Sequence, residues 1–169
     1  VNIVPGEQLG DYRISKFHKI HLLVERLWGL DFMNRFKYIY QFQSRFAKQF
    51  LPELGVKKGI TTEHFDTVVI GSDEVFNCAQ KTWFGFSKQL FGEGLNALKV
   101  ITYAASFGAT TVPKLEKLGI KDTVSSLLKN IDKISVRDAN SVKVVEELTG
   151  SIPNKNVDPV LIYDYTKHM

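Results

Sequence analysis

The sequence lacks several features that would place the protein outside the ordinary globular class. It contains one cysteine in 169 residues, so no disulfide can form within the chain, and a reducing compartment is the simplest environment for it. No apolar run approaches the ~20 residues that a membrane-spanning helix needs. The residues after Val1 also lack the basic and apolar leader of a signal peptide. We therefore expect a cytoplasmic protein.

Two nucleotide-binding signatures are missing as well. The chain has neither a GxGxxG motif nor a Walker loop, so a dinucleotide site and a P-loop nucleotide site are not supported. It also has no internal repeat and no low-complexity segment. Hydrophobic residues make up 44% and charged residues 24% of the chain, which is the balance of a globular domain.

Acidic residues are absent from the stretch between Phe32 and Phe50, which is rich in aromatic residues. Its basic residues are Arg35, Lys37, Arg45 and Lys48. Such a patch can bind nucleic acid or a membrane surface. Apolar residues nevertheless recur there at helical spacing, at Phe32, Phe36, Ile39, Phe46 and Phe50. Because such a stripe is typical of a helix face that a fuller protein covers, we favour packing and expect no nucleic-acid partner.

Hydrophobic periodicity predicts two kinds of structure in succession. Residues 7–51 have a helical pattern that is interrupted near Gly29 and ended by Pro52. Short β-branched runs follow at residues 67–70, 98–104, 133–136 and, more weakly, 156–157 with their neighbours. Between the later runs, two helix faces are predicted by Val124, Leu127, Leu128 and Ile131, and by Val142, Val145 and Leu148, with Gly150 as a stop. Alternating strands and helices predict an α/β fold with a mostly parallel sheet and flanking helices on both faces.

Small or polar residues follow each predicted strand. The four loops are Gly71-Ser72-Asp73-Glu74, Ser106-Phe107-Gly108, Arg137-Asp138 and Asp158-Pro159. In an open parallel sheet the carboxyl ends of the strands form one edge, where ligands bind. A single loop of this kind is as often a helix cap or a turn. Four of them at one edge predict a pocket.

The residue types suggest different roles in this pocket. Gly71 and Gly108 allow backbone amides to approach an anion closely. Arg137 precedes a helix whose predicted cap is Asp138, so its charge opposes the helix dipole, and an anionic ligand would relieve that conflict. The structural alternative is that Arg137 only pairs with Asp138 or another acid. Asp73 is the candidate catalytic residue, because its carboxylate, if buried, would accept a proton from a sugar hydroxyl. The alternatives are that Asp73 only hydrogen-bonds such a hydroxyl, or that Ser72 or Asp73 is a structural cap.

Histidine and cysteine residues provide weaker signals. His18 and His21 are spaced to share a helix face, but no third ligand is in view, so we expect no metal site. His64 precedes a strand and is expected at the surface. Cys78 has no activating histidine nearby in the sequence and is interpreted as a packing residue.

Four segments in this order resemble those of the polysaccharide pyruvyl transferase family: FDTVVIGSDEVFN, KVITYAASFG, IDKISVRDANSV and NVDPVLI. The resemblance covers about residues 65–162. It implies a transferase of two Rossmann-like halves, similar to the glycosyltransferase-B architecture. Such an enzyme moves a pyruvyl group from phosphoenolpyruvate to hydroxyls of a cell-surface sugar, forming a ketal.

The resemblance also implies a domain organisation. Residues 1–60 would be a helical segment of the same domain, residues 61–159 a Rossmann-like core, and residues 160–169 the start of a linker to a second domain. Because the chain ends at Met169, where the second half should begin, we expect a truncated N-terminal half that is inactive alone. The general acid, a histidine in this interpretation, would lie in the missing half.

We assign the predicted pocket to two substrates. The residues expected to bind the donor are Arg137, Ser106 and Gly108, and those expected to bind the acceptor are Gly71, Ser72, Asp73 and Glu74. The acceptor would be a sugar or a lipid-linked oligosaccharide, which would bring the protein to the inner face of the membrane as a peripheral protein. Phosphoenolpyruvate is a substrate, and no cofactor is expected. Many relatives have Gln and then Trp where this chain has Glu74 and Phe76, which leaves the acceptor open.

Two other functions remain as alternatives. One is a nucleotide-sugar glycosyltransferase of similar architecture, and the other is a non-catalytic carbohydrate-binding or assembly module. Phosphate release from phosphoenolpyruvate, without consumption of a nucleotide sugar, would distinguish the pyruvyl transferase from both.

Overall fold

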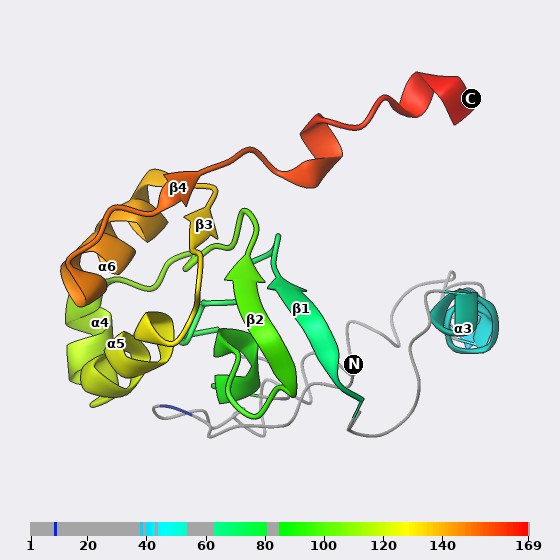
Figure 1. Ribbon diagram of the computed structural model, residues 1–169. Coiled ribbons are helices and arrows are strands. Elements are labelled where there is room, and N and C mark those ends of the chain that lie inside the picture. Colours follow the sequence, from blue (N-terminus) through cyan, green and yellow to red (C-terminus); the bar gives the residue numbers. More distant parts are fainter. Residues whose placement is uncertain are drawn as a thin grey trace, which may run out of the picture. The chain divides into compact units, whose positions relative to one another are not determined.

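Figure 1 shows the computed structural model of the chain, which describes residues 9, 38, 40–42, 44–53, 63–80 and 85–168. The chain divides into two compact units. The first comprises Val1–Asn2 and Asp11–Thr61, and the second comprises Ile3–Gly10 and Thr62–Met169. All strands within the described ranges belong to the second unit. That residues 1–60 and the core form a single domain stays a prediction.

The second unit contains parallel strands that lie side by side in the order of the sequence (Figure 1). Strand β1 (Phe65–Ile70) pairs with β2 (Ala97–Thr102), and β3 (Ser135–Val136) pairs with β4 (Asn154–Lys155). Single parallel bridges, from Ile101 to Lys133 and from Ala105 to Val136, place β3 beside β2. The prediction of a parallel sheet is therefore confirmed, although β4 begins two residues before the predicted run at 156–157. Because all these strands run in one direction, their carboxyl ends meet at one edge.

Helices cover this sheet in one layer. The 3-10 helix η2 (Lys88–Phe91) and the helices α4 (Val112–Lys117), α5 (Lys121–Lys129) and α6 (Ala139–Thr149) contact one another around a common core. Figure 1 shows α4, α5 and α6 on the same side of the strands. Since the strands advance in one direction and crossovers are right-handed, successive helices fall on one face. In the described part of this unit, helices cover one face of the sheet. The prediction of helices on both faces is confirmed for that face only.

The ends of α6 follow from local sequence. Its N-cap is Asp138, whose carboxylate accepts a hydrogen bond from the backbone N–H of Ser141. At its C-cap, Gly150 has φ 75°, a left-handed conformation that glycine adopts without a steric penalty. Both predicted boundaries are confirmed. The helix buries Val144, Val145 and Leu148, while Val142 is half-buried.

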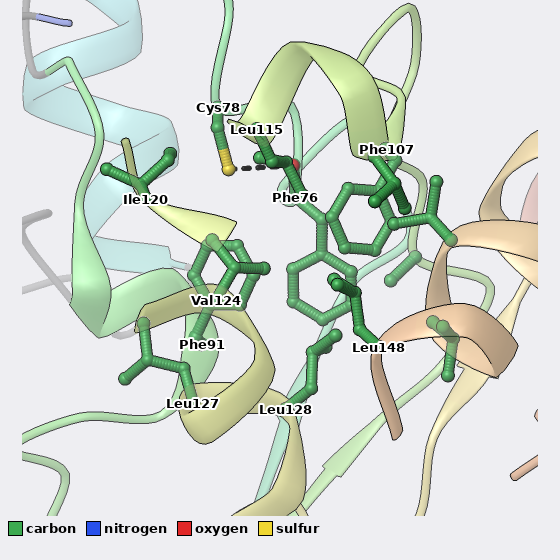
Figure 2. Close-up of a cluster of buried hydrophobic side chains, with 14 of the residues drawn as sticks. Phe76, Cys78, Phe91, Phe107, Leu115, Ile120, Val124, Leu127, Leu128 and Leu148 are labelled. Carbon is green, nitrogen blue, oxygen red and sulfur yellow. Dashed lines mark hydrogen bonds between the residues drawn. The ribbon is translucent and has the colours of Figure 1, made fainter. Parts of the chain in front are cut away.

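Four phenylalanines form an aromatic cluster in the core: Phe76, Phe86, Phe91 and Phe107. The rings of Phe76 and Phe91 are stacked with centroids 4.6 Å apart, and the Phe107 ring lies 5.2 Å from that of Phe76. Figure 2 shows Phe76, Phe91 and Phe107 surrounded by aliphatic side chains of α4, α5 and α6. Phe76 and Phe107 belong to the loops after β1 and β2. Packing of their rings in the core therefore fixes the positions of these two loops.

The described part of the first unit is helical. It includes the π-helical turn η1 (Phe46–Phe50) and the short helix α3 (Leu51–Glu53). The N–H of Leu51 bonds to the carbonyl oxygen of Phe46, so helical structure continues past Pro52 to Glu53. The described helix thus ends one residue after the predicted stop at Pro52, a difference within the usual uncertainty of a helix end. Much of the predicted helix 7–51, including His18 and His21, lies outside the described residues.

Aromatic side chains spaced four residues apart form an aromatic row on this helix: Tyr38, Phe42, Phe46 and Phe50. Successive ring centroids are 6.0–6.2 Å apart. The exposed fractions are 41–67%. Phe46 and Phe50 also belong to the predicted apolar stripe, and its packing against a fuller protein stays a prediction. Among the described helices, none combines the length and apolarity needed to cross a bilayer.

Two 3-10 helices follow β4. They are η3 (Pro159–Leu161) and η4 (Tyr165–His168). Asp158 caps η3 by accepting a hydrogen bond from the backbone N–H of Val160 at 3.1 Å. This cap fixes Asp158 just beyond the end of β4.

Candidate functional site

The loops after the strands converge at the carboxyl edge of the sheet, here called the polar edge (residues 71–74, 106–108, 137–138 and 158–159). Backbone hydrogen bonds join the loops after β1 and β2: Ser106 N–H donates to Asp73 O at 3.1 Å, and Phe76 N–H donates to Ser106 O at 3.0 Å. The N–H of Arg137 donates to Ala105 O at 3.1 Å. The structure therefore brings the predicted site residues together, while their binding roles stay predictions.

Arg137 lies at the centre of the polar edge. Its Nη1 donates to Asp158 Oδ2 at 2.8 Å and to the carbonyl oxygen of Ser72 at 2.6 Å. Its Nη2 lies 3.6 Å from Asp73 Oδ1. The guanidinium thus connects the loops after β1, β3 and β4. The acidic partners of Arg137 are Asp158 and Asp73; Asp138 forms no ion pair with it within the described structure.

Asp138 is the centre of a separate hydrogen-bond network. Its Oδ2 accepts from the hydroxyls of Ser106, at 2.7 Å, and Ser141, at 2.8 Å, and its Oδ1 accepts from Ser141 N–H at 2.8 Å. Burial acts to raise the pKa of Asp138, but the hydrogen bonds from Ser106 and Ser141, together with the charge of Arg137, lower that pKa below its ordinary value. The Asp138 carboxylate is therefore ionised at neutral pH and accepts the hydrogen bonds from Ser106 and Ser141 in that form.

This network also orients the loop after β2. Ser141 Oγ accepts a hydrogen bond from Phe107 N–H at 2.8 Å, and Ser106 Oγ accepts one from Gly108 N–H at 2.9 Å. The hydroxyl and amide expected to bind the donor are thus engaged with the protein itself. For Ser106 or Gly108 to bind a ligand directly, one of these bonds would have to be exchanged.

Glycine at positions 71 and 108 permits close approach between chain segments. Gly71 has φ 137°, and a Cβ there would overlap the carbonyl oxygen of Tyr103. Gly108 has φ 53°, and a Cβ there would overlap the carboxylate of Glu74 and lie 2.8 Å from Asn77 Nδ2. Position 71 therefore requires glycine, because the obstacle is backbone, whereas a side chain at position 108 would be strained and would displace the Glu74 side chain. The prediction that they approach an anion stays untested.

Two asparagines that the sequence analysis missed support the polar edge. Asn77 Nδ2 donates to Glu74 Oε2 at 2.7 Å, and its Oδ1 accepts from Thr110 Oγ1 at 2.8 Å. Asn140 Nδ2 donates to the carbonyl oxygens of Gly108, at 3.0 Å, and Thr110, at 2.9 Å. Their partners are mostly about thirty residues away in sequence, so sequence spacing carried no signal for these contacts. Only the position of Asn77 in the same loop as Glu74 hinted at its role.

The acidic side chains of the first loop are open to solvent. The Asp73 side chain is 90% exposed, and Glu74 is also exposed. A catalytic-base role for Asp73 requires a buried carboxylate, whereas the Asp73 side chain is exposed. By contrast, Phe76, two residues beyond Glu74, is fully buried in the aromatic cluster. A ligand at this edge can therefore contact Glu74, whereas Phe76 acts on the site only through packing.

The remaining candidates have structural surroundings. Cys78 is buried, its Sγ donates to the carbonyl oxygen of Phe76 at 3.4 Å, and burial raises its pKa to about 12. This agrees with the interpretation of Cys78 as a packing residue, because a thiol is a poor nucleophile without ionisation. His64 is exposed, with Nδ1 3.1 Å from Asn96 Oδ1. Among the described residues, no group of three or more His, Cys, Asp or Glu side chains is placed to hold a metal ion.

A parallel sheet with helices packed against it and polar loops at its carboxyl edge is compatible with an α/β protein. Residues 8–167 match the family model of polysaccharide pyruvyl transferases. The chain therefore belongs to the polysaccharide pyruvyl transferase family, as the four sequence segments indicated. The match also includes most of the N-terminal helical region, which the resemblance did not cover. Searches of curated proteins and of solved structures gave no match.

Proposed function

We propose that this chain forms part of an enzyme that transfers a pyruvyl group from phosphoenolpyruvate to two hydroxyls of a cell-surface polysaccharide sugar, forming a ketal. Family membership supports the reaction class. The observation that carries the proposal is the position of Arg137, whose guanidinium lies at the polar edge among loops from three strands. That edge is where parallel α/β sheets bind their ligands.

The reaction defines what the protein must provide. The C2=C3 double bond of phosphoenolpyruvate is lost as C3 gains a proton, C2 gains bonds to two sugar oxygens, and the bond from C2 to the phosphate oxygen breaks. The two hydroxyls lose two protons: one balances the proton gained at C3, and the other leaves with inorganic phosphate. The donor carries a carboxylate and a phosphate, so a cation with a planar fork of N–H donors suits it. Arg137 is the residue of the polar edge with that chemistry. We assign the protonation of C3 to a histidine of a second Rossmann-like half, in a glycosyltransferase-B-like arrangement.

The acceptor side of the proposal rests on the first loop. Glu74 is exposed beside Gly108, and its Oε2 accepts from Asn77 Nδ2, so the carboxylate is held in place while it remains open to solvent. A carboxylate in this position can accept hydrogen bonds from sugar hydroxyls. We therefore assign discrimination among acceptors to Glu74 rather than to the buried Phe76. The acceptor is a sugar, free or lipid-linked, and a lipid-linked acceptor would place the enzyme at the inner face of the membrane.

The proposal is tested with the whole protein that carries this chain, by measuring phosphate release from phosphoenolpyruvate in the presence of candidate sugar acceptors. Arg137→Ala is expected to lower kcat/KM by about a hundredfold or more, because a charge-assisted contact to the donor is lost. Arg137→Lys should recover little, since an ammonium cannot reproduce the fork. Lys143→Ala, on the exposed side of α6, is the matched control and should leave the rate unchanged.

Three outcomes would contradict the proposal. Undiminished transfer by Arg137→Ala would remove Arg137 from the donor site. Consumption of a nucleotide sugar, with no release of phosphate from phosphoenolpyruvate, would favour a glycosyltransferase. Sugar binding without either reaction would favour a carbohydrate-binding module.

A further inference from the structure

The two acidic partners of Arg137 are held in different ways. Asp158 Oδ2 is 2.8 Å from Arg137 Nη1, and the Asp158 side chain is 30% exposed. The other carboxylate oxygen of Asp158 caps η3 through Val160 N–H. Asp73 Oδ1 lies 3.6 Å from Nη2, and its side chain is 90% exposed. Besides Arg137, Asp73 has a local hydrogen bond from the N–H of Glu74 at 2.7 Å.

These differences predict different strengths. An ion pair with a fully hydrated carboxylate at a long distance contributes little, because water screens the attraction and ordering the side chain costs entropy. A shorter pair that is partly shielded from water, with its carboxylate also fixed by a backbone cap, is harder to separate. Breaking the ion pair between Asp73 and Arg137 therefore costs little free energy, whereas breaking the pair between Asp158 and Arg137 costs more.

The acidic charge of the polar edge gives a reason for Asp73 to separate from Arg137 when an anion binds. Its loops contain the carboxylates Asp73, Glu74, Asp138 and Asp158, and Arg137 is their only Lys or Arg residue. Asp138 is satisfied by serine hydrogen bonds and Asp158 by Arg137 and the cap. An anion that binds at Nη2 would meet the Asp73 carboxylate in the same place. Coulomb repulsion at such short range opposes binding unless Asp73 moves away.

We propose that Asp73 is an exchangeable counter-ion of Arg137. Its carboxylate holds Nη2 in the ligand-free site, and a carboxylate or phosphate group of the ligand replaces it, while Asp158 remains bound at Nη1. This inference rests on the donor role of Arg137 proposed above. It gives Asp73 a function that needs exposure, in place of the general-base role that would need burial.

The test measures the affinity of the whole protein that carries this chain for inorganic phosphate and for phosphoenolpyruvate, by calorimetry at low ionic strength. Asp73→Asn removes the competing charge and is expected to tighten phosphate binding about three- to tenfold. Asp158→Asn removes the fixed partner and should weaken binding by a similar or larger factor. Asp66→Asn, an exposed position on β1, controls for the change in net charge and should leave affinity unchanged.

A double-substitution cycle separates exchange from a structural effect. In an Arg137→Ala background, Asp73→Asn should no longer alter phosphate affinity, because the two residues act on the same ligand group. Asp73→Ser provides a second neutral variant if Asp73→Asn does not fold, as judged by thermal melting. The proposal is overturned if the neutral variant leaves phosphate affinity unchanged or weaker, if Asp66→Asn tightens it equally, or if the gain persists without Arg137.

The inference and the proposed function can fail separately. Phosphate binding is measured without a sugar and without turnover, so a gain in Asp73→Asn stands even if no pyruvyl transfer is found. In that case only the proposed function fails. If the whole protein transfers pyruvyl groups but Asp73→Asn binds phosphate no more tightly than the wild type, only the exchange mechanism fails.

Discussion

The aromatic cluster of the second unit and the aromatic row of the first use similar residues in different ways. In the row, neighbouring rings are four positions apart on one helix, and the side chains are 41–67% exposed. In the cluster, the rings come from separate loops and from η2, and the side chains are at most 5% exposed. The predicted apolar stripe shares Phe46 and Phe50 with the row, and its other members lie outside the described residues. Spacing along the chain does not distinguish the exposed rings of the row from the buried rings of the cluster.

This difference has a consequence for the site. Phe76 and Phe107 belong to the same loops as Glu74 and Ser106, so the cluster supports the polar edge directly. The aromatic row has contacts of its own along one helix. Substitutions in the cluster should therefore affect stability and the site together, and substitutions in the row should affect neither strongly. The size of the expected change should decrease from substitutions in the cluster to substitutions in the row.

The reactivity of Cys78 should report the integrity of the cluster. At pH 8 a thiol with a pKa of about 12 is ionised in about one molecule in ten thousand, against about one in ten at the ordinary value of 9.0. Alkylation of folded protein by iodoacetamide should therefore be about a thousandfold slower than alkylation in urea. A Phe42→Cys variant in a Cys78→Ala background supplies the exposed counterpart in the row and should react at nearly the unfolded rate. Equal rates at the two positions would contradict the assigned burial.

Phe107→Ala should destabilise the second unit by about 3–5 kcal/mol, because it removes a fully buried ring and leaves a cavity between Phe76 and Phe91. Urea denaturation followed by circular dichroism measures the free energy of unfolding. Phe107→Leu keeps much of the volume and should cost considerably less. A loss below about 1 kcal/mol for the alanine variant would show that the cluster is less tightly packed than its geometry indicates.

Asp138→Ala should lower the free energy of unfolding by about 2 kcal/mol, since it removes the cap of α6 and the acceptor of the Ser106 and Ser141 hydrogen bonds.

The Asp138 carboxylate should also make stability depend on pH. Because its pKa is lower in the folded state, its stabilisation is complete above the ordinary value of 3.8 and is lost as pH falls below that value. Urea midpoints measured from pH 6 to pH 3 should fall less for the variant than for the wild type. Asp122→Ala, an exposed position in the first turn of α5, should instead follow the wild-type pH dependence.

Phe42→Ala should have the smallest effect, below about 0.5–1 kcal/mol, because it removes one exposed ring and two ring contacts along the helix. The same urea experiment measures it beside Phe107→Ala. A cost comparable to that of Phe107→Ala would show that the row is buried in the protein in solution, as the helical spacing first suggested.

Strand and cap positions were predictable because their causes are local. The run Thr67–Ile70 is part of β1, and Asp138 and Gly150 mark the ends of α6 through their own side chain and backbone conformation. The weak fourth run, 156–157 with its neighbours, marks the end of β4 rather than its start, because pairing with β3 rather than residue type selects Asn154–Lys155 as the strand. The end of the N-terminal helix at Glu53 lies one residue after the predicted stop at Pro52, because a sequence pattern does not fix the last residue of a helix.

The candidate site was predictable in outline and not in its contacts. That the four loops meet follows from the parallel sheet, which the alternating pattern indicated. That Arg137 binds Asp158 and Ser72, rather than Asp138, depends on side-chain directions across separate loops. Asn77 and Asn140 were missed for the same reason, since most of their partners are distant in sequence.

The amino-acid sequence by itself determined the strand and helix types, the ends of α6 and the family of the protein, because these depend on residue patterns read over short distances. The tertiary structure alone decided which phenylalanines of the second unit are buried, where the backbone approach at Gly71 leaves no room for a Cβ, and which carboxylate is fixed to Arg137 and which is open to water. These properties arise from contacts between loops that are tens of residues apart, and such contacts exist only once the sheet has brought the carboxyl ends of its strands to one edge.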